Sequence, residues 1–500
     1  MYNLRPIYDK IIIVIISEFI FGGIFMIFAS YGFLLFFAIV MLGFITLNKL
    51  KLQLISELWL ILSSFYFYAQ GSIAFLPYFI GTVFFNYIIG FMILNQEGDY
   101  ALRNRKVLLC LGIAENVLLL GYFKYTNFLI ANFNLLTGQA MPLRNIILPI
   151  GISFFTFQLI AYLVDCYRGE TKEYTVTNYL LFITFFPQLI VGPIVHHKDI
   201  VPQFEEGKQF NLNMRNIMLG ILIFAIGSAK KTLLADPLTG YAQEFFNNVY
   251  VGGLWETWTS VFAYTFSYYF DLSGYADMAI GLGLFFNINL PQNFNSPYKA
   301  RNFRDYWRRW HMTLSKFLSD YVFRSIYKKG NTTFRFYMAV MTTFLVSGFW
   351  HGAGWRFVLW GIINGIFVCF AHILTRRKWK LPFALAWTLT FAGILGTRVI
   401  FVSNRIKDAL YVYRSLFDFT EFSGMTFTAI LSDGGRFLVF NLYIITVLLV
   451  GMAIAFFAAN TEEIAEGFKP GFKYAIMAGV LLMISFIQMT SVSKFLYFQF

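Results

Sequence analysis

The stretch FYMAVMTTFLVSGFWHGAGWRFVLWGIINGIFVCFAHILT, residues 336–375, consists of two apolar runs separated by a glycine-rich segment. Residues 336–350 would span about 22 Å as an α-helix, at about 1.5 Å per residue. Gly348, Gly352 and Gly354 permit a tight turn and a close approach of the backbone. The stretch therefore predicts a helical hairpin whose turn lies deep in a membrane and whose two ends lie on the same side.

The composition of the whole chain also indicates a membrane protein. Of its 500 residues, 58% are apolar and 13% are charged, whereas an ordinary soluble domain has about 45–50% and about 25%. A soluble protein of this size has too little polar surface to cover so much hydrocarbon. The composition excludes a cytosolic enzyme, a nucleic-acid-binding domain and a disordered chain. The apolar runs are continuous rather than alternating, which predicts an all-α fold and not a barrel.

Apolar runs close to the ~17–25 residues that cross a bilayer recur along the chain. They lie at 11–28, 31–47, 54–69, 72–94, 107–123, 146–165, 178–195, 213–235, 256–286, 334–350, 355–375, 383–402, 437–458 and 473–492. Some are short enough to be re-entrant, so we predict about a dozen spans in one membrane-embedded domain, residues 1–500. We interpret the first run as a retained span and not a cleaved signal, because further apolar runs follow at once. The lack of an internal repeat disfavours a transporter built from duplicated halves.

The cysteines and three of the five histidines offer no catalytic or metal-binding pattern. The cysteines are Cys110, Cys166 and Cys369. Their spacing matches neither a disulfide framework nor a zinc site, so we expect small core residues. His196 and His197 follow Pro193 in a polar stretch and are expected in an exposed loop. His372 precedes a run of basic residues and is expected to snorkel or to cap a helix end.

Residues 299–335, called the basic block here, hold ten Lys or Arg against two Asp, a net +8 out of the chain's +13. Positions 303, 306/307, 310, 314, 317/318 and 321 are apolar or aromatic at helical spacing, which predicts a basic amphipathic helix. Such a helix belongs at a membrane interface, and the positive-inside bias places it on the cytoplasmic side. It either contacts anionic lipid or docks a phosphorylated or acidic acyl donor, with Arg308, Arg309, Trp307 and Trp310 as the candidate binding residues.

His351 and His311 are the candidate catalytic residues. His351 lies in SGFWHGAGW, residues 347–355, at the predicted turn, and His311 directly follows Trp310. An ionisable residue at that depth suggests a functional site, although a core histidine satisfied by a neighbour is the alternative. An imidazole can accept the proton of a hydroxyl while that oxygen attacks a thioester carbonyl.

Four tryptophans and one carboxylate complete the candidate site. The tryptophans are Trp307, Trp310, Trp350 and Trp355. They either wall a pocket that excludes water or form an ordinary interfacial belt, and the sequence leaves both open. Asp271 with Ser273 is expected to cap a helix, whereas Asp277 falls within a helical run and must find a partner. No residue set predicts a metal site or a bound cofactor.

YWRRWHMTLSKFLSDYVF, residues 306–323, followed by SGFWHGAGW resembles the membrane-bound O-acyltransferase family. The closer resemblance is to its bacterial branch, which includes the membrane subunit of alginate O-acetylation and the D-alanyl transferase of teichoic acids. Further similar segments are LPIGISFFTFQLIAYLVDCYRGE (148–170), FFPQLIVGPI (185–194), FDLSGYADMAIGLG (270–283), NFNSPY (293–298) and FLYFQF (495–500). The resemblance is strongest over 148–360, the motif-bearing core, and weakest over residues 1–50. GTRVIFVSN, residues 396–404, departs from the aromatic-Phe-Arg cluster of the family.

The resemblance implies a helical fold with a central funnel or tunnel, His351 as the catalytic histidine and His311 as the second. It implies a multi-pass protein of the bacterial cytoplasmic membrane that moves an acyl group, favouring acetyl, to a cell-surface or exported polysaccharide. The expected donor substrate is acetyl-CoA or an acyl carrier protein. Expected partners are membrane lipids and an extracytoplasmic SGNH-type acetyltransferase or a polysaccharide synthase complex, and not nucleic acid. The alternatives are D-alanylation of a teichoic-acid-type polymer, a flippase for a lipid-linked glycan, and an inactive scaffold.

Overall fold

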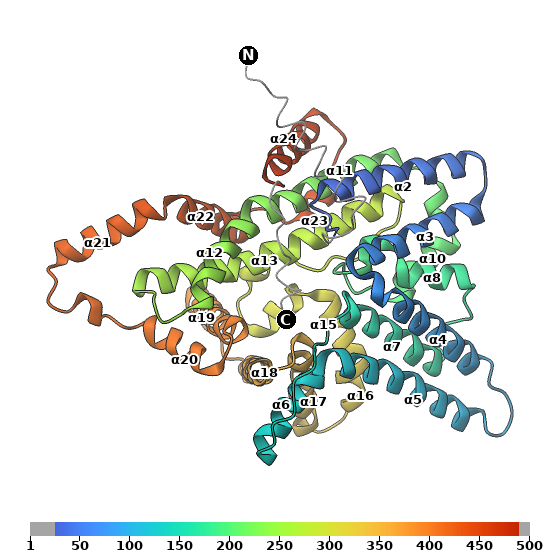
Figure 1. Ribbon diagram of the computed structural model, residues 1–500, viewed down its shortest axis with the longest axis horizontal. Coiled ribbons are helices and arrows are strands. Elements are labelled where there is room, and N and C mark those ends of the chain that lie inside the picture. The colour runs from blue at the N-terminus through green and yellow to red at the C-terminus, as the bar shows by residue number, and fades with distance from the viewer. Residues whose placement is uncertain (1–25, 490–500) are drawn as a thin grey trace. The chain divides into compact units, whose positions relative to one another are not determined.

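The computed structural model describes residues 26–489, which fold into helices joined by loops and contain no β-strand (Figure 1). The predicted all-α fold is confirmed. In an apolar solvent a helix satisfies its backbone hydrogen bonds within the segment, which explains why so apolar a chain adopts this architecture. Most of the predicted first span, 11–28, and the FLYFQF motif lie outside the described residues.

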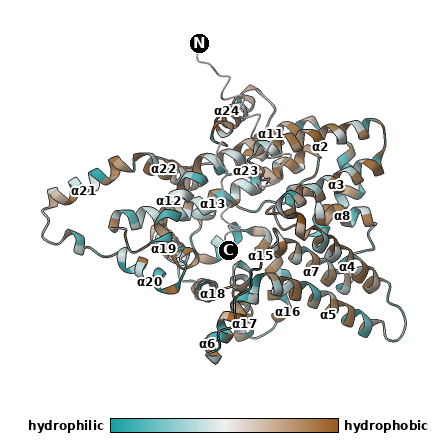
Figure 2. Cartoon of the chain, in the orientation of Figure 1, coloured by the Kyte–Doolittle hydropathy of each residue, from teal (hydrophilic) through white to brown (hydrophobic). Residues whose placement is uncertain are grey.

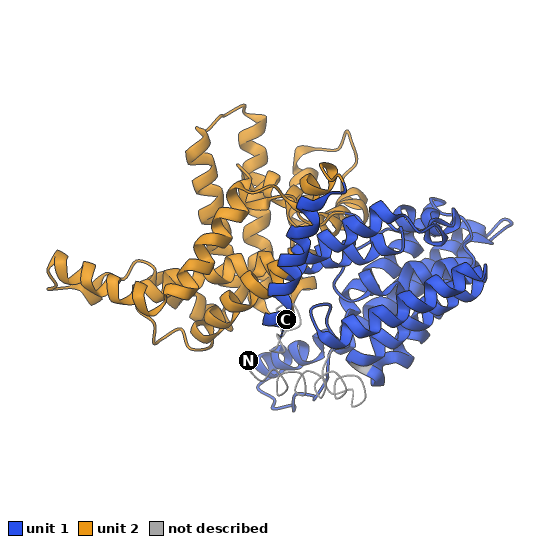
Figure 3. Cartoon of the chain, turned by 90° about the horizontal axis from the view of Figure 1, so that it is seen from above, with its two compact units in different colours: residues 1–228, 275–291, 470–492 blue, residues 229–274, 292–469, 493–500 orange. Residues whose placement is uncertain are grey.

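The described residues form two compact units (Figure 3). Unit 1 comprises 26–228, 275–291 and 470–489, and unit 2 comprises 229–274 and 292–469. The helices of unit 1 are α2 (Tyr31–Lys49), α3 (Gln53–Ser72), α4 (Leu76–Leu94), α5 (Ala101–Leu120), α6 (Thr126–Thr137), α7 (Ile152–Arg168), α8 (Val176–Thr184), α9 (Phe186–Leu189), α10 (His197–Glu205), α11 (Met214–Ala229) and α24 (Phe472–Gln488). Those of unit 2 are α12 (Asp236–Asn247), α14 (Phe303–Arg309), α15 (Met312–Leu318), α16 (Arg324–Ile326), α17 (Thr333–His351), α18 (Trp355–Arg376), α19 (Phe383–Val402), α20 (Ile406–Ser415), α21 (Phe427–Phe440), α22 (Leu442–Phe457) and α23 (Thr461–Glu466). The long helix α13 (Leu254–Phe285) contributes residues to both units.

Six helical stretches among the described residues are long and apolar enough to cross a membrane. They are Tyr31–Lys49, Ile73–Leu94, Ala101–Thr137, Met214–Asn247, Trp355–Arg376 and Phe383–Val402. The helices α21 and α22 pass the same test together but are bent by 85°, so they count at most as one further span. Figure 2 shows apolar residues along most of α2 and α4. Several other predicted runs are divided among shorter helices, such as α8 and α9, so the predicted dozen spans stays a prediction.

The predicted hairpin is present as the antiparallel pair α17 and α18, and the depth of its turn in a membrane stays a prediction. Two glycines let the helices touch through their backbones. A Cβ atom added at Gly348 would lie 2.4 Å from the carbonyl oxygen of Phe357, and one added at Gly361 would lie 2.4 Å from that of Phe344. Only residues without a side chain fit at these two crossing points.

The basic block does not form the continuous amphipathic helix that its spacing predicts. Helix α14 ends at Arg309, α15 begins at Met312, and a π-helical turn, Ser319–Phe323, leads into α16. The break falls at His311, whose φ of 47° and ψ of 52° lie in the left-handed region. Both short helices bury apolar and aromatic residues, so the helical spacing of such residues continues across the break. The spacing alone therefore does not reveal that the helix is interrupted.

Asp271 does not cap a helix, because α13 continues through it without interruption. Its carboxylate is fully buried and lies 2.7 Å from the Nζ atom of Lys231, which lies 2.7 Å from Asp236 as well. Lys231 belongs to a π-helical segment, Lys230–Ala235, between α11 and α12. The expected cap is therefore corrected to a buried ion-pair cluster, in which one cation offsets two carboxylates.

His196 and His197 are buried, and the prediction of an exposed loop is wrong. His197 has an exposed fraction of 0%, and its Nε2 atom lies 2.8 Å from the Oδ2 atom of Asp165. The Tyr174 hydroxyl lies 2.7 Å from the Nδ1 atom of the same ring. These partners come from α7 and from the loop before α8, so the polar sequence around His197 reflects buried hydrogen bonding rather than exposure.

The three cysteines are free, as the sequence predicts. Only Cys166 is buried in the core, whereas Cys369 is half-buried and Cys110 is exposed on α5. The expectation that all three are core residues therefore holds for Cys166 alone.

Candidate active site

His351 is the last residue of α17, and its ring is enclosed by aromatic side chains in unit 2. Its exposed fraction is 4%. The ring centroid lies 4.8 Å from that of Trp350, 5.0 Å from that of Trp360 and 5.3 Å from that of Phe401, all at steep angles between the planes. These contacts come from the two helices of the hairpin and from α19. They keep bulk water away from the imidazole, which strengthens electrostatic interactions around it.

His311 lies against the same tryptophan. Its exposed fraction is 3%, and its ring centroid lies 5.9 Å from that of Trp350 at an interplanar angle of 77°. The Trp350 indole therefore contacts both histidine rings, from motifs that are far apart in the sequence. Phe294 contacts His311 as well, with 6.0 Å between the centroids. Within unit 2 the fold thus brings the two predicted histidines into one aromatic cluster.

The left-handed backbone of His311 is held by the segment that precedes α14. The carbonyl oxygen of Asn293 accepts a hydrogen bond from the backbone N–H of Met312 at 2.9 Å. The Asn293 Oδ1 atom accepts from the N–H of Thr313 at 3.3 Å and from its hydroxyl at 3.0 Å. A residue in this region costs about 1–3 kcal/mol, and such strain persists where the surroundings determine the conformation. Asn293 belongs to the NFNSPY motif, so this motif is the part of the sequence that indicates a supporting role for the segment.

The Nδ1 atom of His311 is buried and has no hydrogen-bond partner among the described residues. Burial lowers the pKa of this imidazole to about 3, so the ring is neutral at neutral pH. A neutral imidazole can donate through one nitrogen and accept through the other. The arrangement therefore leaves the Nδ1 atom of His311 available for a hydrogen bond to another group.

The four predicted tryptophans lie in different surroundings. Trp350 contacts both histidine rings. Trp307 contacts Trp360, with 5.6 Å between the ring centroids. Trp310 is buried and stacks with Tyr268 at 5.7 Å. Trp355 is 58% exposed at the start of α18, unlike the buried Trp350 and Trp310.

The two predicted donor-binding arginines also differ. Arg309 donates from Nε to the Oδ1 atom of Asp305 at 2.9 Å and from Nη1 to the carbonyl oxygen of Asn295 at 3.3 Å. Arg308 is exposed on the same helix. Arg308 is thus the more accessible of the two, while Arg309 contributes to the structure around α14.

Arg398 is a residue of this cluster that the sequence analysis missed. It lies in α19 and is 3% exposed, with its Nη2 atom donating to the Tyr306 hydroxyl at 3.0 Å. Its Cζ atom lies 4.3 Å from the ring centre of Trp310 and 4.4 Å from that of Tyr268. No ion pair with a carboxylate is found for it within residues 26–489. The sequence feature that could have identified it is that Arg398 is a single arginine within the apolar run 383–402.

Asp277 is buried in the part of α13 that belongs to unit 1, and its predicted place in the pocket lining stays a prediction. Among the described residues, no group of three or more His, Cys, Asp or Glu is arranged to hold a metal ion.

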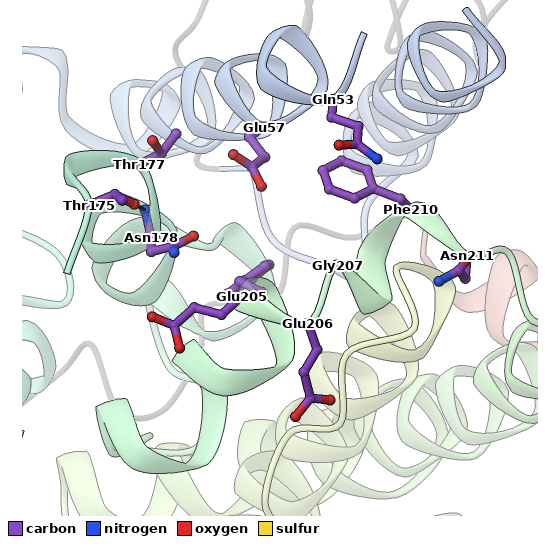
Figure 4. Close-up of a pocket in the computed structure, with 11 residues that line it drawn as sticks. Gln53, Glu57, Thr175, Thr177, Asn178, Glu205, Glu206, Gly207, Phe210 and Asn211 are labelled. Carbon is purple, nitrogen blue, oxygen red and sulfur yellow. Dashed lines mark hydrogen bonds between the residues drawn. The ribbon is translucent and has the colours of Figure 1, made fainter. Parts of the chain in front are cut away.

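Unit 1 contains a polar cavity of about 560 Å³ whose wall includes three glutamates (Figure 4). Glu205 lies 3.0 Å from the Nζ atom of Lys172, and Glu206 lies 3.0 Å from that of Lys208. Glu57 accepts a hydrogen bond from the Gln209 side chain at 3.0 Å. Each carboxylate therefore already has a partner within the chain, and the cavity contains no histidine among its lining residues.

Comparison with known proteins relates the sequence of this chain to a family of enzymes. The sequence profile of the membrane-bound O-acyltransferase family matches residues 23–394. The peptidoglycan O-acetyltransferase of Helicobacter pylori is 36% identical, over 90% of this chain and 92% of that protein. The probable alginate O-acetylase AlgI of Pseudomonas aeruginosa is 34% identical, over 88% of this chain and 86% of that protein. The teichoic acid D-alanyltransferase of Streptococcus thermophilus is 30% identical, over 46% of this chain and 58% of that protein.

Proposed function

This chain belongs to the membrane-bound O-acyltransferase family and is a multi-pass membrane O-acyltransferase, and we propose that it acetylates a hydroxyl group of a cell-envelope glycan. The donor is a cytoplasmic thioester, acetyl-CoA or an acetylated carrier protein, and the membrane is the bacterial cytoplasmic membrane. The observation that carries the proposal is the pair of buried histidine rings that both contact Trp350. The names of the relatives favour acetyl as the acyl group, and peptidoglycan is the first acceptor to test.

In the proposed reaction one proton moves from the acceptor hydroxyl to His351 and then from His351 to the departing thiolate. His351 accepts the proton of the attacking hydroxyl, a C–O bond forms at the thioester carbonyl, the C–S bond breaks, and the departing thiolate takes the proton. His311, neutral and with a free nitrogen, donates a hydrogen bond to the carbonyl oxygen as negative charge develops there. Trp350 keeps the two rings in place and limits hydrolysis by water.

The donor and acceptor sides have different supporting residues. Arg308 is exposed on α14 and suits the phosphates of coenzyme A or of a carrier-bound phosphopantetheine. The acceptor receives the acetyl group directly or through an extracytoplasmic SGNH-type partner or a synthase complex. D-alanylation of a teichoic-acid-type polymer is a second candidate, because the same chemistry serves it and a D-alanyltransferase is among the relatives.

The proposal is tested with His351→Ala and His351→Gln in membrane vesicles that contain equal amounts of folded protein. We expect acetyl transfer from labelled acetyl-CoA to added glycan to fall about 10²–10⁴-fold, the usual loss when a general base is removed. His372→Gln is the matched control, because His372 belongs to the other end of the same hairpin and packs on Phe336. Undiminished transfer in both His351 variants would overturn the assignment.

A further inference from the structure

A cavity of about 530 Å³ lies in unit 2 where the ends of three helices meet. The start of α14, the end of α18 and the start of α19 form its wall. Its lining is mostly apolar, comprising Phe303, Phe367, Phe370, Leu374, Phe383 and Leu389 among others. Phe303 and Phe367 are in contact, with 4.4 Å between their ring centroids. Such a surface accommodates a hydrocarbon chain.

The same cavity carries positive charge and no negative charge. Arg301 and Lys380 are among the lining residues, both are exposed, and the lining contains no carboxylate. The Arg301 guanidinium lies 4.6 Å from the centre of the Phe383 ring, which directs it across the apolar wall. Arg376 and Arg377 at the end of α18 are exposed as well, although they are not among the lining residues. The charge therefore favours an anionic group at the edge of the cavity.

An exposed tryptophan in the lining favours a position of this cavity near a membrane interface. Trp379 is 61% exposed and also lines the cavity, and aromatic residues of this kind concentrate where hydrocarbon meets headgroups. We propose that the cavity binds one anionic phospholipid, with its phosphate between Arg301 and Lys380 and an acyl chain against Phe303 and Phe367. Basic pockets between membrane helices on the cytoplasmic side bind such headgroups.

The bound lipid would connect with the histidine cluster through α14. Phe303 and Trp307 lie one helical turn apart on this helix, and Trp307 contacts Trp360, which contacts His351. A Cβ atom added at Gly393 would lie 2.5 Å from the Phe303 ring, so α19 approaches closely on the other side. An acyl chain packed on Phe303 thus supports α14, the helix that carries Trp307 and the two candidate donor-binding arginines. The proposal of a lipid site does not depend on the proposed reaction.

The test measures lipid retention by the full-length chain. The protein is taken from bilayers of phosphatidylcholine with added phosphatidylglycerol into detergent, and the retained lipid is identified by native mass spectrometry. We expect phosphatidylglycerol to be retained preferentially. The double variant Arg301→Gln/Lys380→Gln should retain about 30-fold less, because each basic residue near an anionic headgroup is worth about a factor of five in affinity. Ala386→Phe fills the cavity without changing its charge and should prevent retention as well.

The matched control is Lys328→Gln/Lys329→Gln, which removes two exposed charges of the basic block outside the cavity and should leave retention unchanged. Equal retention of phosphatidylglycerol by the Arg301/Lys380 double variant and by the original protein would overturn the proposal. Displacement of the lipid by free inorganic phosphate would overturn it in favour of a simple anion site. Displacement by coenzyme A would overturn it in favour of a donor site.

Discussion

The guanidinium of Arg398 lies 4.3 Å from the centre of the Trp310 ring, and the tryptophan immediately precedes His311. A buried charge without a carboxylate partner is costly, and here the aromatic faces and the Tyr306 hydroxyl provide the compensation. Arg398 therefore holds in place the Trp310 ring, which neighbours His311 in the sequence. It is a positioning residue, because it acts through Trp310 and not on the reacting atoms.

Replacing Arg398 by Met should destabilise the protein by about 2–4 kcal/mol, since it removes three cation–π contacts, with Trp310, Tyr268 and Phe401, and one charged hydrogen bond. Thermal unfolding in detergent measures this loss. Acetyl transfer per folded molecule should fall at least tenfold through kcat. Arg398→Lys should recover part of the stability, because an ammonium retains the charge but not the planar stacking. Arg436→Met, on the exposed side of α21, is the control and should change neither quantity.

Because His311 has a left-handed backbone conformation, substitutions there can separate the cost of backbone strain from the loss of the imidazole. Glycine accepts this conformation without penalty, whereas alanine does not. We expect His311→Gly to be about 1 kcal/mol more stable than His311→Ala, and both to lose transfer activity. Equal melting temperatures for the two variants would show that the backbone at residue 311 relaxes. Full activity in His311→Gly would remove the imidazole from the mechanism.

The backbone contact of α17 with α18 should not tolerate a methyl group. Gly348→Ala places a Cβ atom 2.4 Å from the Phe357 carbonyl oxygen, so the helices must separate at a cost of about 1–3 kcal/mol. Activity should fall as well, because His351 lies less than one turn further along α17. Gly240→Ala is the control, since a Cβ at that exposed position meets nothing within 4 Å. A Gly348→Ala protein with the original melting temperature would contradict this packing.

The cluster of Lys231, Asp271 and Asp236 should behave as a coupled unit. Removing the cation with Lys231→Met takes the positive charge away from the fully buried Asp271 carboxylate and should cost about 3–5 kcal/mol. Asp271→Asn should cost less, because Asp236 still pairs with Lys231. In thermal unfolding, the double variant Lys231→Met/Asp271→Asn should lose less stability than the sum of the losses of the two single variants. Strict additivity would show that the two groups do not interact.

The features that the sequence predicted well are those encoded locally. The α17–α18 hairpin follows from two apolar runs around closely spaced glycines, and the histidines of the cluster follow from two recognisable motifs. The break at His311 was missed because it depends on hydrogen bonds from Asn293, which apolar spacing does not report. The burial of His197 depends on Asp165 in another helix, and the role of Arg398 depends on rings from α13 and α14. Partners from distant segments decide these cases, and a pattern along one chain does not identify them.

The α17–α18 hairpin has a consequence for the order of assembly during synthesis. Its backbone contacts join residues close together in sequence, so little chain entropy is lost when they form. Every residue needed for these contacts has been made once α18 is complete, before α19 leaves the ribosome. The nascent chain can therefore insert this pair as a finished unit, onto which the later helices, including the one that carries Arg398, are added.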